Sequence, residues 1–136
     1  MSDAYAKPLP PIDGPNAPFW AGAREQKLML QRCLDCERYR FPASRYCPSC
    51  LGERSEWQAT SGQGVVVSYC GFHKAYWPSF ANDVPYDVVQ VRLKEGVQLF
   101  SNLIDVPREQ IKIGMKVRAH FDAVTAAVTL VKFKLR

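Results

Sequence analysis

Alternating hydrophobic and polar residues predict that most of this chain folds as β-strands. In residues 27–33, Leu28 and Leu30 share one face, whereas Met29 and Gln31 share the other, which is the period of a strand. Five later segments alternate in the same way or are rich in β-branched and aromatic residues, and we expect strands there: residues 65–72, 86–93, 97–104, 116–121 and 128–135. Short turns separate several of them, which is typical of a small all-β barrel or sandwich.

The last of these strands is expected to be half-buried. Lys132 and Lys134 fall on one face, whereas Val131, Phe133 and Leu135 fall on the other. Successive side chains of a strand point to opposite faces of its sheet. One face of this strand therefore suits solvent and the other suits a core.

One short helix is expected at residues 16–24, with Asn16 as the N-cap and Pro18 in the first turn. Phe19, Trp20 and Ala23 lie close together on one side of it. Five of the ten prolines lie within residues 1–18, and proline disfavours helix in the residue before it. We therefore expect a flexible, Pro-rich arm at residues 1–15, which is either a disordered leader or a segment that packs on a partner.

Four of the five cysteines form two C-x2-C pairs that are ten residues apart: Cys33, Cys36, Cys47 and Cys50. Two intervening residues let a tight turn direct both sulfurs toward one point, and two such turns complete a tetrahedron around Zn²⁺. Four thiolates leave no open coordination position, so the predicted zinc is structural. An iron–sulfur cluster or a single iron ion is the alternative occupant.

The length of 136 residues and the absence of long apolar runs also limit the function. No run approaches the about 20 apolar residues that a membrane span needs, and no secretory signal is visible. We therefore expect a cytoplasmic protein with no membrane partner, in which paired cysteines bind metal rather than form disulfides.

Net charge suggests an anionic partner. The formal charge is +5, although a zinc ion with four thiolates lowers it to +3. Residues 108–136 contain seven Lys or Arg and only two Asp or Glu. This stretch is either a solvated strand face or the contact surface of a single-stranded nucleic-acid-binding module. The latter, which we do not favour, predicts affinity that falls steeply with salt.

Two single residues within the predicted strands could carry chemistry. Cys70 is expected to be a small, buried hydrophobic residue. His120 alternates within its strand, and we expect a surface or barrel residue rather than a base. The chain has only one other histidine, His73, and no motif pairs a nucleophile with a base. We therefore do not expect an independent enzyme.

The segment 72–86 is long for a connection between two strands, and long loops in compact domains are often functional. Its side chains could place cations beside flat aromatic faces: His73, Lys74, Tyr76 and Trp77. Such a combination suits a nucleotide, either in nucleic acid or in coenzyme A, and also suits a protein interface. The alternative is a loop that only covers one end of a barrel.

Several short motifs, taken together and in order, resemble one family. They are the Phe19-Trp20 helix, the cysteine pairs, Arg40-Phe41-Pro42 between these pairs, Gly62-Gln63-Gly64-Val65-Val66, Pro85-Tyr86-Asp87-Val88-Val89, Leu99-Phe100-Ser101-Asn102-Leu103-Ile104 and Ile113-Gly114-Met115-Lys116-Val117. Residues 16–136 resemble the acyl-CoA-associated zinc-ribbon plus OB-fold proteins, long known as a domain of unknown function.

The resemblance implies a mainly β fold. A short N-terminal helix and a rubredoxin-like zinc ribbon occupy residues 16–60, and a five-stranded OB-fold barrel occupies residues 61–136. It also implies a non-catalytic accessory or scaffold subunit. Members pair with thiolase-superfamily enzymes such as thiolases, acyltransferases and aldolases, or with MaoC-like hydratases, and they help to bridge subunits and to bind acyl-CoA.

In this family the catalytic residues reside on the partner. Because coenzyme A carries phosphates, a nearby cation would help to bind it, and the expected contacts with CoA or the partner are Arg45, His73, Lys74, Tyr76 and Trp77.

One residue departs from the family pattern. Members often have glycine directly after the second cysteine of the first pair, where this chain has Glu37. A positive φ at this position costs glutamate more than glycine. All four cysteines remain, so we still expect metal binding.

Overall fold

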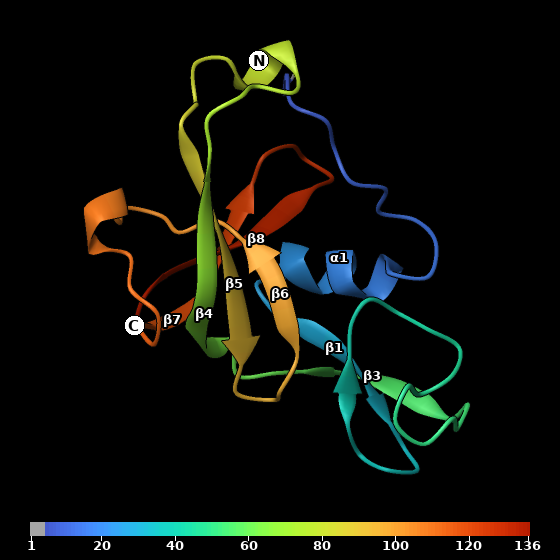
Figure 1. The fold of residues 1–136 in the computed structure, drawn as a ribbon. Coiled ribbons are helices and arrows are strands. Elements are labelled where there is room, and N and C mark those ends of the chain that lie inside the picture. Colours follow the sequence, from blue (N-terminus) through green and yellow to red (C-terminus); the bar gives the residue numbers. More distant parts are fainter. Residues whose placement is uncertain (1–4) are drawn as a thin grey trace.

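The computed structural model, which describes residues 5–136, contains two sheets and one α-helix (Figure 1). The first four residues of the predicted arm lie outside the described residues. The helix is α1 (Ala17–Arg24). It has eight residues. Within residues 5–136, no helix is long and apolar enough to cross a membrane.

The smaller sheet carries the cysteine pairs. It has three antiparallel strands in the order β2-β1-β3, with bounds β1 (Met29–Cys33), β2 (Tyr39–Arg40) and β3 (Ser55–Ala59). Strand β1 was predicted, because Leu28 and Leu30 alternate and are both buried. Strands β2 and β3 were not predicted, since neither carries enough hydrophobic residues to show a period. They form because β1 offers them hydrogen bonds on both of its edges.

The larger sheet has five strands in the order β6-β5-β4-β7-β8. Their bounds are β4 (Gln63–Phe72), β5 (Tyr86–Leu93), β6 (Gln98–Ser101), β7 (Lys116–Ala123) and β8 (Thr129–Leu135). All neighbouring pairs are antiparallel. Single turns of 3-10 helix, Pro78–Phe80 and Arg108–Gln110, lie in two of the connections. Each strand overlaps one of the five predicted segments.

The larger sheet curls until its two edge strands meet. Just beyond β6, Leu103 forms a parallel bridge with Phe133 of β8. The Ile104 amide donates to the Phe133 carbonyl at 2.8 Å, and the Phe133 amide donates to the Asn102 carbonyl at 3.0 Å. This seam explains why β6 is shorter than the predicted strand 97–104. Five strands closed along one short seam form the partly open barrel of an OB fold, as predicted.

The barrel interior is filled by alternate residues of its strands. Each of these side chains is at most 2% exposed: Val66, Val89, Val91, Leu93, Val117 and Phe133. The residues that alternate with them along the strands, such as Arg92 and Arg118, face solvent, as expected for strands with one buried face. In β8, Phe133 lies in the core whereas Leu135 is 48% exposed.

Helix α1 joins the two sheets, because it contacts β1 of the smaller sheet and also β7 and β8 of the larger sheet. Phe19 and Ala23 are buried, and Trp20 packs against the same core. Asn16 occupies the predicted N-cap position, but its side chain does not cap the helix. Its Oδ1 instead accepts a hydrogen bond from the Ala43 amide at 2.8 Å, which ties the start of the helix to the smaller sheet.

The prediction that Cys70 is buried was wrong, because its side chain is exposed. Strand β4 pairs with β7 only as far as Val65, and beyond this point its ladder is with β5 alone. The pairing with β5 also shifts between Val66 and Ser68. The outer half of β4 therefore leaves the barrel wall, and alternation no longer decides which side chains are buried.

The described part of the N-terminal arm packs on the chain's own barrel. Lys7 Nζ lies 2.8 Å from Asp83 Oδ2 and 5.4 Å from the centre of the Phe80 ring. The hydrogen bond to Asp83 raises the pKa of Lys7 above its usual range. The arm is thus tied to the long loop between β4 and β5 at the top of Figure 1.

Candidate metal centre and adjoining groove

The fold brings the two cysteine pairs together at one end of the smaller sheet. The four sulfur atoms all lie within 4.8 Å of one another: those of Cys33, Cys36, Cys47 and Cys50. Cys33 and Cys47 are buried, whereas Cys50 is exposed at the edge. No other group of three or more metal-ligating side chains is this close together within residues 5–136.

The spacing of the sulfurs fits a tetrahedral metal rather than disulfides. The Cys33 and Cys50 sulfurs are 3.6 Å apart, and so are those of Cys36 and Cys47. A disulfide requires about 2.05 Å, whereas four thiolates at about 2.3 Å from Zn²⁺ lie about 3.8 Å from one another. The four cysteines thus have the arrangement of a closed zinc-ribbon site, with no position left for a substrate.

Backbone amides point at the sulfurs and favour their ionised form. The Asp35 and Ser49 amides lie 3.4 Å and 3.3 Å from the sulfurs of Cys33 and Cys47. The Cys36 amide contributes most to lowering the pKa of Cys33, and that of Cys50 most to lowering the pKa of Cys47 to about 6.

The fourth cysteine behaves differently. The Gly52 amide lowers the pKa of Cys50, but the surrounding sulfurs, that of Cys33 foremost, raise it to about 12. Without a metal, four neighbouring thiols cannot all ionise, since like charges repel. A divalent cation removes this repulsion.

A buried glutamine holds the two cysteine pairs in position. Gln31, which is 8% exposed, donates from Nε2 to Ser55 Oγ at 2.8 Å and accepts at Oε1 from the Ser44 amide at 3.0 Å. Arg40 is equally buried and donates to the Ser44 carbonyl at 2.9 Å. A segment this polar has little hydrophobic core of its own, so its order depends on these hydrogen bonds and on the metal.

The backbone after each cysteine pair is left-handed. Glu37 has φ 68° and Leu51 has φ 66°, in the region that favours glycine. Glu37 thus has a positive φ at the position where members of the family that the sequence resembles often have glycine.

Replacing Glu37 with glycine is expected to stabilise the protein by roughly 0.5–1 kcal/mol, because relief of the left-handed strain exceeds the added entropy of the unfolded chain. Chemical denaturation of the zinc-loaded protein measures this change. The exposed Glu53→Gly variant is the control, since no positive φ is present there. Destabilisation by Glu37→Gly would mean that the ion pair of Glu37 with Arg32, at 3.6 Å, outweighs the strain.

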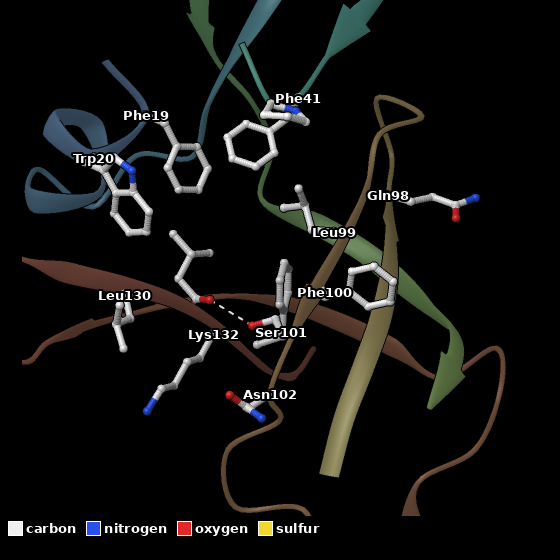
Figure 2. Close-up of a pocket in the computed structure, with 13 residues that line it drawn as sticks. Phe19, Trp20, Phe41, Gln98, Leu99, Phe100, Ser101, Asn102, Leu130 and Lys132 are labelled. Atoms are coloured by element: carbon white, nitrogen blue, oxygen red, sulfur yellow. Dashed lines mark hydrogen bonds between the residues drawn. The ribbon is translucent and has the colours of Figure 1, made fainter. Parts of the chain in front are cut away.

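A groove of about 540 Å³ lies where the helix, the smaller sheet and the barrel meet (Figure 2). Phe19 and Trp20 form one wall, and their rings are 5.0 Å apart and nearly perpendicular. Phe41 directly follows β2 of the smaller sheet, and the centre of its ring lies 4.5 Å from that of Phe19. Such junctions are where binding pockets are commonly found, and the volume is within the usual range.

The opposite wall of the groove comes from the two edge strands of the barrel. Residues 98–102 and 130–133 line it, and Ser101 Oγ donates across the gap to the Val131 carbonyl at 2.8 Å. Phe100 on β6 is 76% exposed. Lys132 and Asn102 lie at one end (Figure 2), and Lys132 is held by Asp122 at 2.7 Å. The groove is thus apolar with one polar end.

None of the five predicted contact residues lines this groove. The predicted loop residues are all exposed, and Lys74 lies 5.0 Å from the centre of the Tyr76 ring. The base of the loop is ordered by stacking of Phe72 on Tyr86, whose rings are 5.3 Å apart. The inner aromatics of the loop thus pack on one another at its base, while Tyr76 and Trp77 are exposed.

Arg45 lies far from this loop. It belongs to the segment between the cysteine pairs, at the opposite end of the molecule in Figure 1. Its Nε lies 3.1 Å from Glu53 Oε1, so its charge is already paired. The structure therefore does not bring Arg45 together with the four loop residues.

Sequence reasoning did not select the groove. Phe19 and Trp20 were predicted to share one side of the helix, whereas Phe41 and Phe100 appeared only within motifs. These residues come from three separate places in the sequence: α1, the segment after β2, and β6. They meet only because of the way the helix packs against the barrel. One signal in the sequence could have indicated the groove. Phe100 is an aromatic residue on the polar face of its strand, next to the buried Leu99.

Two family models match the chain in succession. Residues 20–56 match the rubredoxin-like zinc ribbon domain of ChsH2, and residues 57–122 match the C-terminal OB-fold domain of ChsH2. The first contains all four clustered cysteines, and the second contains most of the barrel.

Curated relatives carry two kinds of names. The chain is 33% identical over 94% of its length to a probable enoyl-CoA hydratase alpha subunit of Thermomonospora curvata, but it spans only 40% of that protein. It is 30% identical, over 88% of its length, to the 3-oxo-4,17-pregnadiene-20-carboxyl-CoA hydratase alpha subunit of Mycobacterium tuberculosis. It spans only 37% of that protein. It is also 30% identical to a DUF35 domain-containing scaffold protein of Methanocaldococcus jannaschii, with 75% of this chain and 73% of that protein covered.

Solved structures support the same assignment. A chain of the Ltp2-ChsH2(DUF35) aldolase matches with a TM-score of 0.82 and 32% identity, over 93% of this chain and 98% of that one. A DUF35 protein of unknown function from Sulfolobus solfataricus shares the fold, with a TM-score of 0.60 and 17% identity over 88% of this chain and 84% of that one. The chain therefore belongs to the DUF35 family, in which a rubredoxin-like zinc ribbon is joined to an OB-fold domain.

Proposed function

We propose that this chain is a non-catalytic accessory or scaffold subunit of a complex with a thiolase-superfamily enzyme, namely a thiolase, acyltransferase or aldolase. In this proposal the chain helps to bridge subunits and to bind acyl-CoA. A MaoC-like hydratase is a further partner in the proposal. One observation carries it: the match to the Ltp2-ChsH2(DUF35) aldolase covers nearly the whole of both chains. The scaffold and alpha-subunit names of the other relatives agree with a role inside a complex.

The metal in this proposal is structural. Cys33, Cys36, Cys47 and Cys50 hold one Zn²⁺, and the closed set of thiolates gives it no catalytic position. Its contribution is to order the smaller sheet, which forms one side of the groove through Phe41. Bond making and breaking belong to the partner enzyme.

Two surfaces are proposed as contacts. The groove combines an apolar lining with the exposed ring of Phe100, and exposed aromatic residues are common anchors of protein interfaces. The second surface is the β4–β5 loop, where His73, Lys74, Tyr76 and Trp77 offer cations and rings to the partner or to coenzyme A. Arg45 stays in the proposal as a contact of the zinc ribbon.

The test is affinity purification of the tagged chain from its native source, followed by mass spectrometry and measurement of stoichiometry. We expect an enzyme of the thiolase superfamily in fixed ratio with the chain. Phe100→Glu places a charge at the mouth of the groove and is expected to reduce recovery of the enzyme at least tenfold, since a buried unpaired charge is costly.

Ile113→Glu is the matched control, because Ile113 is 69% exposed and lies outside the groove; its recovery should equal that of the wild type. Turnover of an acyl-CoA by the purified chain alone would contradict the accessory role. Recovery of nucleic acid with no enzyme would favour the alternative, a single-stranded nucleic-acid-binding module.

A further inference from the structure

Two rows of positively charged residues cross the outer face of the barrel. In the first row, Val65 of β4 pairs with Arg92 of β5 on one side and with Lys116 of β7 on the other. The Arg136 amide extends this row, because it donates to the Lys116 carbonyl at 3.2 Å. Three of the four positions therefore carry a positive charge, and the fourth is valine.

The second row lies two residues further along the same strands. Gln63 of β4 pairs with Arg118 of β7, and Arg118 pairs with Lys134 of β8. Lys94 completes the row, since its amide donates to the Gln63 carbonyl at 2.8 Å. We call the six cations of both rows the basic face: Arg92, Lys94, Lys116, Arg118, Lys134 and Arg136.

The charges of the basic face are not neutralised within the described residues 5–136. None of the six forms an ion pair there; the nearby Asp122 is taken by Lys132 at 2.7 Å, and a Glu95 oxygen accepts from the Ser61 amide at 2.9 Å. Six cations exceed the formal net charge of +5, so the rest of the chain carries one more acid than base. The positive charge of this protein is thus localised on one face.

This arrangement acts against the stability of the isolated chain. Arg118 and Lys134 lie directly opposite each other on neighbouring strands, and like charges at such positions repel. A hollow of about 430 Å³ beside β4 is lined by Arg92, Lys94 and Arg136 and has no acidic residue in its walls. An anionic surface that fits against this face relieves the repulsion.

We propose that the basic face docks on an acidic patch of the partner enzyme. Four strands at about 4.8 Å and two residues along each give a face of about 14 by 7 Å, which suits a compact cluster of carboxylates. Arginine binds carboxylates in a bidentate manner. The proposal rests on the accessory role proposed above and adds the chemistry by which the partner is recognised.

Nucleic acid fits this face less well. A face of this size spans about four phosphates along one strand of a duplex. Binding of single strands usually uses stacking on exposed aromatic rings. None of the exposed aromatics among the described residues occupies a position in either row: Tyr46, Tyr69, Tyr76, Trp77 and Phe100.

The test compares charge-reversal variants in binding to the enzyme that the wild-type chain recovers. Arg118→Glu with Lys134→Glu is expected to lower the association rate at least tenfold and to weaken its salt dependence, because opposite charges speed encounter. Arg24→Glu with Lys112→Glu is the control, since both residues are exposed and lie outside the basic face; it should leave the rate unchanged.

A second variant separates docking from folding. Lys134→Glu alone places opposite charges across β7 and β8, so it is expected to raise the melting temperature by roughly 2 °C while it slows association with the partner. Slower association in a more stable protein cannot come from unfolding. If both reversal variants bind the enzyme as fast as the wild type, the basic face is not a docking site.

The remaining outcomes are also decisive. If the wild-type chain recovers no enzyme, the accessory role fails and this inference fails with it. If the wild-type chain recovers the enzyme and the charge-reversal variants associate with it at the wild-type rate, the accessory role survives and only the docking site is overturned. If the wild type binds a single-stranded oligonucleotide and charge reversal abolishes that binding, the basic face serves nucleic acid instead.

Discussion

Replacing Cys47 with serine is expected to reduce bound zinc from one ion per chain to less than a tenth and to unfold the smaller sheet. Cys47 is 1% exposed, and a serine hydroxyl is a poor ligand where a thiolate is required. Structural zinc contributes roughly 10–16 kcal/mol to folding in zinc-finger peptides. Because Leu28 and Leu30 join the barrel core, unfolding of this sheet should also lower the melting temperature of the whole chain.

Elemental analysis and hydrogen exchange of the Leu30 and Gln31 amides measure these effects. Cys70→Ser is the matched control, since it makes the same chemical change at an exposed cysteine outside the cluster. Full zinc content in Cys47→Ser would contradict the ligand assignment, and iron or visible absorbance in the wild-type protein would identify the alternative occupants. Zinc competes with protons for the thiolates, so lowering the pH should release it.

Replacing Phe133 with alanine is expected to destabilise the protein by about 3–5 kcal/mol, the usual cost of truncating a buried phenylalanine. Phe133 is fully buried, and its backbone forms the seam with Asn102 and Ile104. Phe133 is also one of the residues that line the groove. The cavity left by the ring should therefore loosen both the barrel seam and the groove.

Thermal denaturation should show a decrease of roughly 10–20 °C, with faster hydrogen exchange at the Ile104 amide than in the wild type. Leu135→Ala is the control in the same strand, because Leu135 is 48% exposed and its truncation leaves no cavity. An equal loss of stability in the two variants would mean that β8 is not anchored through Phe133.

Much of this architecture could be predicted from local pattern. Strand β5 has the predicted bounds of residues 86–93, because Val89, Val91 and Leu93 face one core in unbroken alternation. The cysteine cluster followed from spacing, since a C-x2-C turn directs two sulfurs to one point wherever the turn lies in the fold. The helix followed from residues that stabilise the start of helices, although Asn16 uses its side chain elsewhere.

Other features could not be predicted, because they depend on residues far apart in the sequence. The buried side chain of Gln31 has its hydrogen-bond partners in Ser44 and Ser55, which lie outside its own strand. Cys70 is exposed because β7 leaves β4 at Val65, which no property of Cys70 reveals.

By itself, then, the sequence determined which segments are strands, where the metal site forms and how much charge the chain carries. Period and ligand spacing are local, so neighbouring residues suffice to set them. Only the tertiary structure decided that Phe19, Phe41 and Phe133 meet around one groove and that cations from three strands gather on one face. Both depend on strand register and on the closure of the barrel, which bring together side chains that the chain itself keeps apart.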